Sequence, residues 1–234
     1  MKLAVQLYSV RDGIDNGDDL LKALEHVKQA GYEGVEFAGT QGLPAETIKA
    51  KLDELGLVCV GTHLGVDDFT PENRDKTLAF YQTLGCACVG VGGGPTGTEQ
   101  DLCRVIEILG GANDAFEPQG VKVYFHNHTG EFQPPEDSAD DRTILERLGE
   151  RMWLEIDTYW SFRAGVDNKT FLRENKDRIC LIHLKDGVDG TPCAIGEGEN
   201  DIAAILDAAE KIGMECFDYF EVLVVDNHKM DIFD

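Results

Sequence analysis

Short apolar runs alternate with longer amphipathic segments along the whole chain. The short runs are typical of β-strands, and strict alternation inside them separates two faces. In residues 3–8, Ala4, Gln6 and Tyr8 lie on one face and the aliphatic odd positions on the other, and the same alternation turns Glu36 inward. Eight strands are expected, at residues 3–8, 34–37, 57–63, 87–91, 121–128, 152–156, 179–184 and 217–225.

The segments between these runs repeat apolar residues at helical spacing, and several end at glycine. Seven helices are expected, at residues 18–30, 44–55, 71–84, 98–116, 143–148, 167–175 and 201–212. This alternation predicts an α/β fold, a parallel (β/α)8 TIM barrel, in one domain over residues 1–234. Only DNHKMDIFD follows the last strand, so an eighth helix is expected to be missing. Either the chain is truncated or a partner subunit closes the seam, which would make the protein a homo-oligomer.

Charge and composition narrow the class of protein. The chain has 42% hydrophobic residues and no apolar run long enough to span a membrane, and its start does not read as a signal peptide. We therefore expect a soluble cytoplasmic protein. The net charge of −23 argues against nucleic acid and against an anionic membrane surface as partner. Seven cysteines without a CxxC pair are expected to be reduced thiols.

Polar residues gather where the later strands end, which is where parallel barrels carry their chemistry. Charged side chains at the end of an apolar strand would cost free energy if they were buried without partners, so we expect them to meet at a shared site. By alternation, the inward positions of the fifth to eighth strands are Tyr124, His126, His128, Glu155, Asp157, His183, Lys185 and Glu221. Imidazole and carboxylates on adjacent strands suit a divalent metal such as Mn²⁺, Co²⁺, Mg²⁺ or Zn²⁺. Each histidine could instead be a hydrogen-bonded structural residue, and Lys185 could form a salt bridge with Glu155 or Glu221.

Six segments resemble the xylose-isomerase-like barrel superfamily of sugar phosphate isomerases and epimerases: GVEFAG, VGTHLG, YFHNHTGEF, EIDTYW, HLKDG and IGEGENDIAAILDAAEKIG. The similarity is greatest to the branch that contains inosose dehydratase. It implies one divalent metal held by Glu, Asp, His and Glu from the fifth to eighth strands, of which Asp157, His183 and Glu221 match three. The remaining glutamate falls at Tyr124, which cannot replace a carboxylate.

Three residues are candidates for that fourth ligand: His126, Glu155 and Glu131. We favour His126, with Glu155 as its partner or as a base. The apurinic-endonuclease branch of the same barrel would need three zinc ions and a basic face, which six histidines and the acidic charge disfavour.

The resemblance implies enolisation of a sugar through an ene-diolate, with Glu221 or Glu155 as the base and Lys185 on a substrate oxygen. His63, His128 and Trp160 are expected to contact the sugar. Dehydration of a keto-sugar or inosose is the alternative reaction, and a degenerate barrel that only binds a sugar or a partner is the non-enzymatic alternative.

Two glycine-rich turns, residues 92–94 and 196–198, are possible phosphate cradles, and Arg163 could bind an anionic group. The loop at residues 129–141 could be either a flap over the site or a solvated loop.

Overall fold

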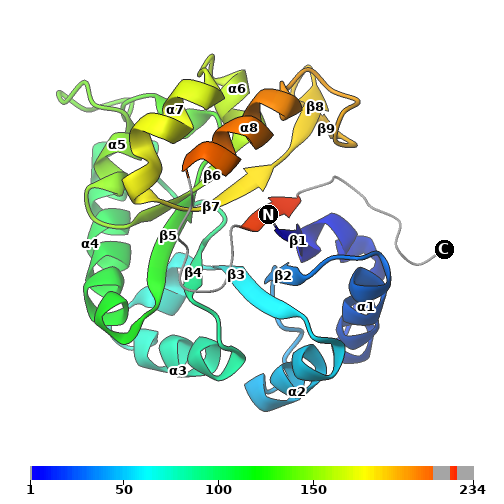
Figure 1. Cartoon of the computed structure of the whole chain (residues 1–234). Helices are drawn as coiled ribbons and strands as arrows, with labels where there is room; N and C mark the ends of the chain where they lie inside the picture. The colour runs from blue at the N-terminus through cyan, green and yellow to red at the C-terminus, as the bar shows by residue number, and fades with distance from the viewer. Residues whose placement is uncertain (1, 213–221, 226–234) are drawn as a thin grey trace.

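Eight parallel strands close into a barrel with the helices around its outside (Figure 1). The computed structural model describes residues 2–212 and 222–225. Around the barrel the strands follow the order β1, β10, β7, β6, β5, β4, β3, β2. They are β1 (Lys2–Gln6), β2 (Gly34–Phe37), β3 (Val58–Leu64), β4 (Cys88–Val91), β5 (Lys122–His126), β6 (Trp153–Asp157), β7 (Ile179–Leu184) and β10 (Val222–Val225). The predicted TIM barrel is confirmed.

All helices but α6 occupy segments that the apolar spacing indicated. They are α1 (Gly17–Gln29), α2 (Ala45–Leu55), α3 (Arg74–Leu84), α4 (Glu99–Phe116), α5 (Ile144–Gly149), α6 (Thr158–Arg163), α7 (Asn168–Asn175) and α8 (Ile202–Ile212). Short 3-10 helices are η1 (Leu7–Gly13), η2 (Val66–Phe69), η3 (Glu117–Gln119), η4 (Gly130–Phe132) and η5 (Lys176–Arg178). Among the described residues, no helix has the length and apolarity to cross a membrane.

Local chemistry explains why several elements begin and end where they do. The Asn16 side chain caps α1, and Thr143 forms a capping box with Glu146 at the start of α5. Helices α2 and α3 both end at a left-handed glycine, Gly56 and Gly85.

Three expectations about the elements were wrong. Helix α3 begins at Arg74 rather than at residue 71, because residues 71–73 form a separate turn, closed by hydrogen bonds from the Asn73 and Arg74 amides to the Thr70 carbonyl. Helix α6 was not predicted. Tyr8 does not face inward from a strand, because the chain turns into η1 after Gln6 and leaves this side chain 55% exposed.

A small hairpin interrupts what the sequence indicated as a loop after β7. It pairs β8 (Asp186–Val188) with β9 (Thr191–Cys193) in antiparallel fashion. Asp189 and Gly190 form its two-residue turn with φ of 49° and 82°, a conformation for which an Asp-Gly pair is favoured.

The loop at residues 129–141 lies against the start of α4. The Glu136 amide donates to the Gly97 carbonyl at 2.9 Å, and the Glu99 amide donates to the Asp137 carboxylate at 2.6 Å. Residues 213–221 and 226–234 lie outside the described residues, and with them the start of the expected last strand, Cys216, Glu221 and the segment after that strand.

Apolar side chains fill two separate spaces. The larger cluster lies between the strands and the surrounding helices and includes Phe37, Leu52, Leu109 and Phe125. The smaller cluster consists of Ala4, Val60, Cys88, Tyr124, Cys180, Leu181 and Val224. The six cysteines of the described residues are free thiols, four of them buried.

Candidate functional site

A cavity of about 520 Å³ opens among residues from the carboxyl ends of the strands. This is the end at which a parallel barrel collects its loops and its chemistry. The wall is formed by Gln6, Tyr8, Ala38, His63, Leu64, Gly92, Gly93, His126, His128, His183 and Lys185. Four imidazoles and one ammonium group therefore border the cavity.

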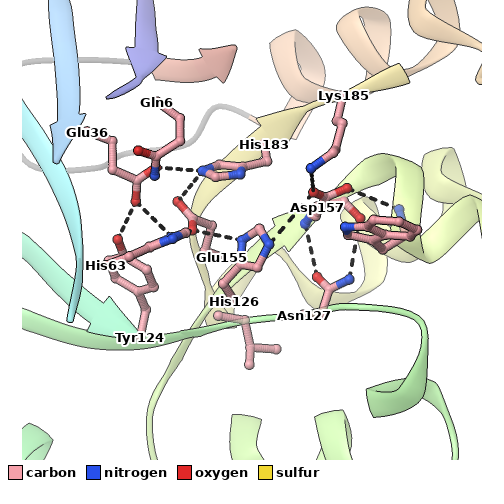
Figure 2. Close-up of polar contacts among 12 residues, drawn as sticks. Gln6, Glu36, His63, Tyr124, His126, Asn127, Glu155, Asp157, His183 and Lys185 are labelled. Atoms are coloured by element: carbon pink, nitrogen blue, oxygen red, sulfur yellow. Dashed lines mark hydrogen bonds and ion pairs between the residues drawn. The ribbon is translucent and has the colours of Figure 1, made fainter. Parts of the chain in front are cut away.

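Beneath this cavity, Glu36 of β2 is fully buried and accepts several hydrogen bonds (Figure 2). Its Oε2 lies 2.9 Å from the Gln6 side-chain amide and 2.6 Å from His183 Nε2. Its Oε1 accepts from the Tyr124 hydroxyl and lies 3.2 Å from His63 Nε2. Sequence alternation turned Glu36 inward but assigned it no role.

Glu155 of β6 is the second fully buried carboxylate at this depth. Its Oε2 lies 2.6 Å from His63 Nε2 and 3.0 Å from His126 Nδ1, and its Oε1 lies 3.1 Å from His183 Nε2. We call Glu36, His63, His126, Glu155 and His183 the carboxylate–imidazole cluster. Glu155 is thus hydrogen-bonded to His126, which is one of the roles expected for it.

Irregular strand pairing occurs at both buried carboxylates. The register between β2 and β3 shifts between Val35 and Glu36, and the register between β6 and β7 shifts between Leu154 and Glu155. Such irregularities occur near active sites, where they redirect a side chain.

Burial and neighbouring charged groups shift the pKa values of these side chains in opposite directions. Burial alone would lower the pKa of His63, but the carboxylates of Glu36 and Glu155 raise it to about 9. Burial lowers the pKa of His126 well below its usual value, despite the hydrogen bond to Glu155. Burial would raise the pKa of Glu155, but His183 and His63 hold it well below its usual value.

Asp157 lies at the end of β6, next to the cluster, and its two carboxylate oxygens have different partners. Its Oδ1 accepts from the Tyr159 and Trp160 amides at 2.9 and 3.0 Å, which caps α6. Its Oδ2 lies 3.5 Å from Lys185 Nζ and 3.7 Å from His126 Nε2. Among the described residues, Lys185 therefore pairs with Asp157 and not with Glu155, one of the two partners expected from the sequence; the other, Glu221, lies outside these residues.

The residues of this region fit a divalent metal. Ligand atoms of His63, His126, Glu155 and His183 all lie within 4.8 Å of one another. Glu155 Oε1 is buried and accepts no hydrogen bond from the described part of the chain, although it lies 3.1 Å from His183 Nε2. Imidazole nitrogen and carboxylate oxygen are ligands that Zn²⁺, Mn²⁺ and Co²⁺ accept.

The structure also locates the other expected site residues. Glu131 is buried and its Oε2 accepts from the His128 amide at 2.7 Å, so this carboxylate organises its own turn. His63 and His128 line the cavity, whereas Trp160 lies next to His128, with ring centroids 5.9 Å apart and ring planes tilted by 38°. Lys185 Nζ lies 5.4 Å from the Trp160 ring.

The second glycine-rich turn is already filled by a side chain of the chain itself. The buried Asp186 carboxylate accepts from the amides of Gly187, Gly196, Gly198 and Asn200 at 2.9–3.0 Å. These amides are thus engaged with an internal anion. Arg163 lies 4.0 Å from Glu199. Gly92 and Gly93 line the cavity.

This chain resembles known proteins both in sequence profile and in fold. The profile of the xylose isomerase-like TIM barrel family matches residues 24–227. None of the curated proteins matches the chain by sequence. Among solved structures, a sugar phosphate isomerase/epimerase from Parabacteroides distasonis superposes with a TM-score of 0.76 at 20% identity, covering 98% of this chain and 92% of that one.

Two further structures share the fold. The IOLI protein with a bound zinc atom has a TM-score of 0.73 at 17% identity and covers 100% of this chain and 91% of its own. The probable 3-DHS dehydratase AsbF from Bacillus anthracis has a TM-score of 0.71 at 14% identity, with coverages of 97% and 92%. At these identities the likeness concerns the fold.

Proposed function

Because this chain belongs to the xylose isomerase-like TIM barrel family, we propose that it is a divalent-metal-dependent isomerase or epimerase of a sugar or sugar phosphate. The observation that carries the proposal is the position of Asp157 beside two histidines that line a cavity of a size suited to a small sugar. Its Oδ2 lies 3.7 Å from His126 Nε2, and His183 is its register partner on β7. A zinc atom in the IOLI structure and the name of the Parabacteroides distasonis protein support the same class.

We propose His126, Asp157 and His183 as the residues that hold the metal, together with Glu221. A divalent cation held there would polarise a substrate carbonyl and stabilise negative charge on adjacent oxygens. Zn²⁺, Mn²⁺, Co²⁺ and Mg²⁺ are all compatible with this mixture of imidazole and carboxylate ligands.

Protein groups around the cavity would bind the sugar and move its protons. Lys185 Nζ borders the cavity and could donate to a substrate oxygen. Glu155 does not line the cavity, so as a base it would exchange protons through His63, whose Nε2 lies 2.6 Å away. His128, backed by Trp160, would contact the sugar, and Glu221 is proposed as the second carboxylate of the reaction.

A metal-dependent dehydratase is the second candidate. Among the described residues, the cavity wall contains imidazoles and an ammonium group but no carboxylate. Such groups are suited to protonate a departing hydroxyl, and the fold is shared with a probable dehydratase. The two reactions differ in their products, because dehydration lowers the mass of the sugar by one water and isomerisation leaves it unchanged.

Elemental analysis of the purified protein tests the proposal first. We expect about one divalent metal per chain in the wild type, and its loss in both Asp157→Ala and His183→Ala. The exposed Asp189→Ala serves as the control and should keep the metal. The metal-loaded protein should then exchange a carbon-bound proton of a keto-sugar with deuterated water.

Two outcomes would contradict the proposal. A folded wild type that stays metal-free after reconstitution would exclude the metal mechanism. A metal-loaded protein that binds a sugar without proton exchange or loss of water would identify a binding protein instead.

A further inference from the structure

We infer that Glu36 and Glu155 are positioning residues, which fix the ring nitrogens that His183 and His126 present to the metal. This inference rests on the proposed function, since it concerns the same metal. It also places the metal on the Asp157 side of the two imidazoles rather than inside the carboxylate–imidazole cluster. Figure 2 shows both rings between the buried glutamates and Asp157.

Two hydrogen-bond donors set the orientation of the Glu36 carboxylate. Gln6 offers its side-chain amide to Oε2 at 2.9 Å. Tyr124 offers its hydroxyl to Oε1, and burial raises the pKa of this phenol well above its usual value, which keeps the proton on the oxygen. Glu36 is thereby held as an acceptor, with Oε2 directed at the His183 ring.

His183 must then donate to Glu36. The distance from His183 Nε2 to Glu36 Oε2 is 2.6 Å, and the same nitrogen lies 3.1 Å from Glu155 Oε1. A carboxylate without a proton only accepts, so Nε2 carries the hydrogen. In a neutral imidazole the other nitrogen then carries the lone pair, and for His183 that is Nδ1. His183 is the register partner of Asp157 on β6.

His126 repeats this arrangement with the nitrogens exchanged. Its Nδ1 lies 3.0 Å from Glu155 Oε2, while its Nε2 lies 3.7 Å from Asp157 Oδ2. Glu155 Oε2 also lies 2.6 Å from His63 Nε2, so two imidazole nitrogens hold this oxygen in place. The lone pair of His126 is thus directed toward Asp157.

Carboxylates behind metal-binding histidines are a general device. They select the tautomer, hold the ring and increase the basicity of the ligating nitrogen, and their loss typically lowers metal affinity by about 10–100-fold. The same logic explains why two fully buried carboxylates lie below a metal site without being its ligands. Their charge is balanced by His63, whose pKa is raised to about 9, and by the other imidazole N–H groups and neutral donors, instead of by a metal ion.

The tautomers can be measured directly by nitrogen NMR of protein labelled with ¹⁵N-histidine and loaded with Zn²⁺. We expect the proton on Nε2 of His183 and on Nδ1 of His126. A proton on the opposite nitrogen of either ring would overturn the inference without any variant. If the wild type binds no metal, the proposed function fails, while the tautomers of the metal-free protein at pH 10 still test the positioning role.

Variants supply the second measurement. Glu36→Gln keeps the size of the side chain but can donate to the ring, so we expect Co²⁺ affinity to fall about 10–100-fold with the stoichiometry unchanged. The Co²⁺ absorption spectrum should also shift, because the ring is no longer held. Asp189→Asn, an exposed carboxylate of the β8–β9 hairpin, is the control and should leave affinity and spectrum unchanged.

His63→Asn decides where the metal lies. His63 contacts both buried glutamates but not Asp157 or Lys185 in any hydrogen bond or ion pair among the described residues. On our inference this variant still binds one Co²⁺ per chain. Loss of the metal in His63→Asn would show that the cluster itself is the metal site and overturn the inference. Undiminished affinity and an unchanged spectrum in Glu36→Gln would overturn it as well, because Glu36 would then not hold the His183 ring.

Discussion

At the scale of single residues, glycines make the room in which the polar site assembles. A Cβ at Gly90 would lie 2.4 Å from the Tyr124 ring, and one at Gly61 would lie 2.9 Å from Glu36 Oε1. Tyr124, which occupies the place expected for a carboxylate on the fifth strand, uses this space to reach the carboxylate of β2. Gly61 on β3 and Gly90 on β4 therefore leave room for the hydrogen bond between Tyr124 of β5 and Glu36 of β2.

Gly92→Ala should displace His63 from the cluster. A Cβ at Gly92 would lie 2.6 Å from His63 Nδ1 and 3.1 Å from its Cγ, which no ring can tolerate without moving. Since His63 is proposed to relay protons, we expect sugar turnover to fall at least about tenfold, corresponding to about 1.4 kcal/mol. Steady-state kinetics with the identified sugar measures this.

Gly97→Ala is the control for that substitution. Nothing lies within 4 Å of a Cβ at Gly97, five residues along the same connection. Its turnover should match the wild type. Equal turnover in Gly92→Ala and the wild type would show that His63 takes no part in the reaction.

At the scale of elements, one carboxylate organises the connection between β7 and α8. Asp186 gathers four backbone amides of residues 187–200, and the Asn200 side chain returns to the Lys185 carbonyl at 2.9 Å. The Tyr159 hydroxyl accepts from the Gly190 amide at 2.8 Å. The HLKD segment thus combines a cavity residue, Lys185, with the anchor of the loop that follows it.

Asp186→Asn should loosen this loop. The substitution removes the charge and places an amide donor against backbone donors, so we expect a loss of about 3 kcal/mol in the free energy of unfolding. Amide hydrogen exchange at Gly196 and Gly198 should accelerate. Urea denaturation and hydrogen-exchange mass spectrometry measure the two effects.

Asp189→Asn provides the comparison within the same hairpin. Asp189 is exposed at a φ of 49°, a conformation that asparagine also accepts. Its stability and exchange should be those of the wild type. Wild-type exchange at Gly196 in Asp186→Asn would mean that the carboxylate does not hold the loop.

At the scale of the whole molecule, closure of the barrel creates the site. The cluster takes its members from β2, β3, β5, β6 and β7, and Gln6 adds β1. A metal that bridges strands from different parts of the chain binds the folded state alone. Its binding energy therefore adds to the stability of the fold.

Thermal unfolding should reveal this linkage. At a free metal concentration about 100 times the dissociation constant, the folded state gains about 2.7 kcal/mol. For a chain of this size the melting temperature should rise by about 5–10 °C. Calorimetry with and without Zn²⁺ measures the shift, which should vanish in Asp157→Ala. A shift of equal size in that variant would place the stabilising metal elsewhere.

The sequence by itself determined the architecture and the set of side chains that meet at its rim. Strict alternation in the strands and helical spacing between them predict a barrel, because both periods follow from backbone geometry alone. The alternation of side chains along each strand then predicts which polar residues face inward: Glu36, His126, Glu155, Asp157, His183 and Lys185. The resemblance to the isomerase barrels, carried by motifs such as EIDTYW and HLKDG, led to the family that the comparison with known proteins shows.

Only the tertiary structure decided how those side chains pair. His183 meets Glu36 across 147 positions of sequence, and Lys185 pairs with Asp157. Register shifts at Glu36 and Glu155 change the height of each carboxylate, which alternation alone does not predict. The physical reason is that a hydrogen bond depends on tenths of an ångström between groups on different strands. Those distances are set by the stagger of a closed barrel and not by the pattern along any one strand.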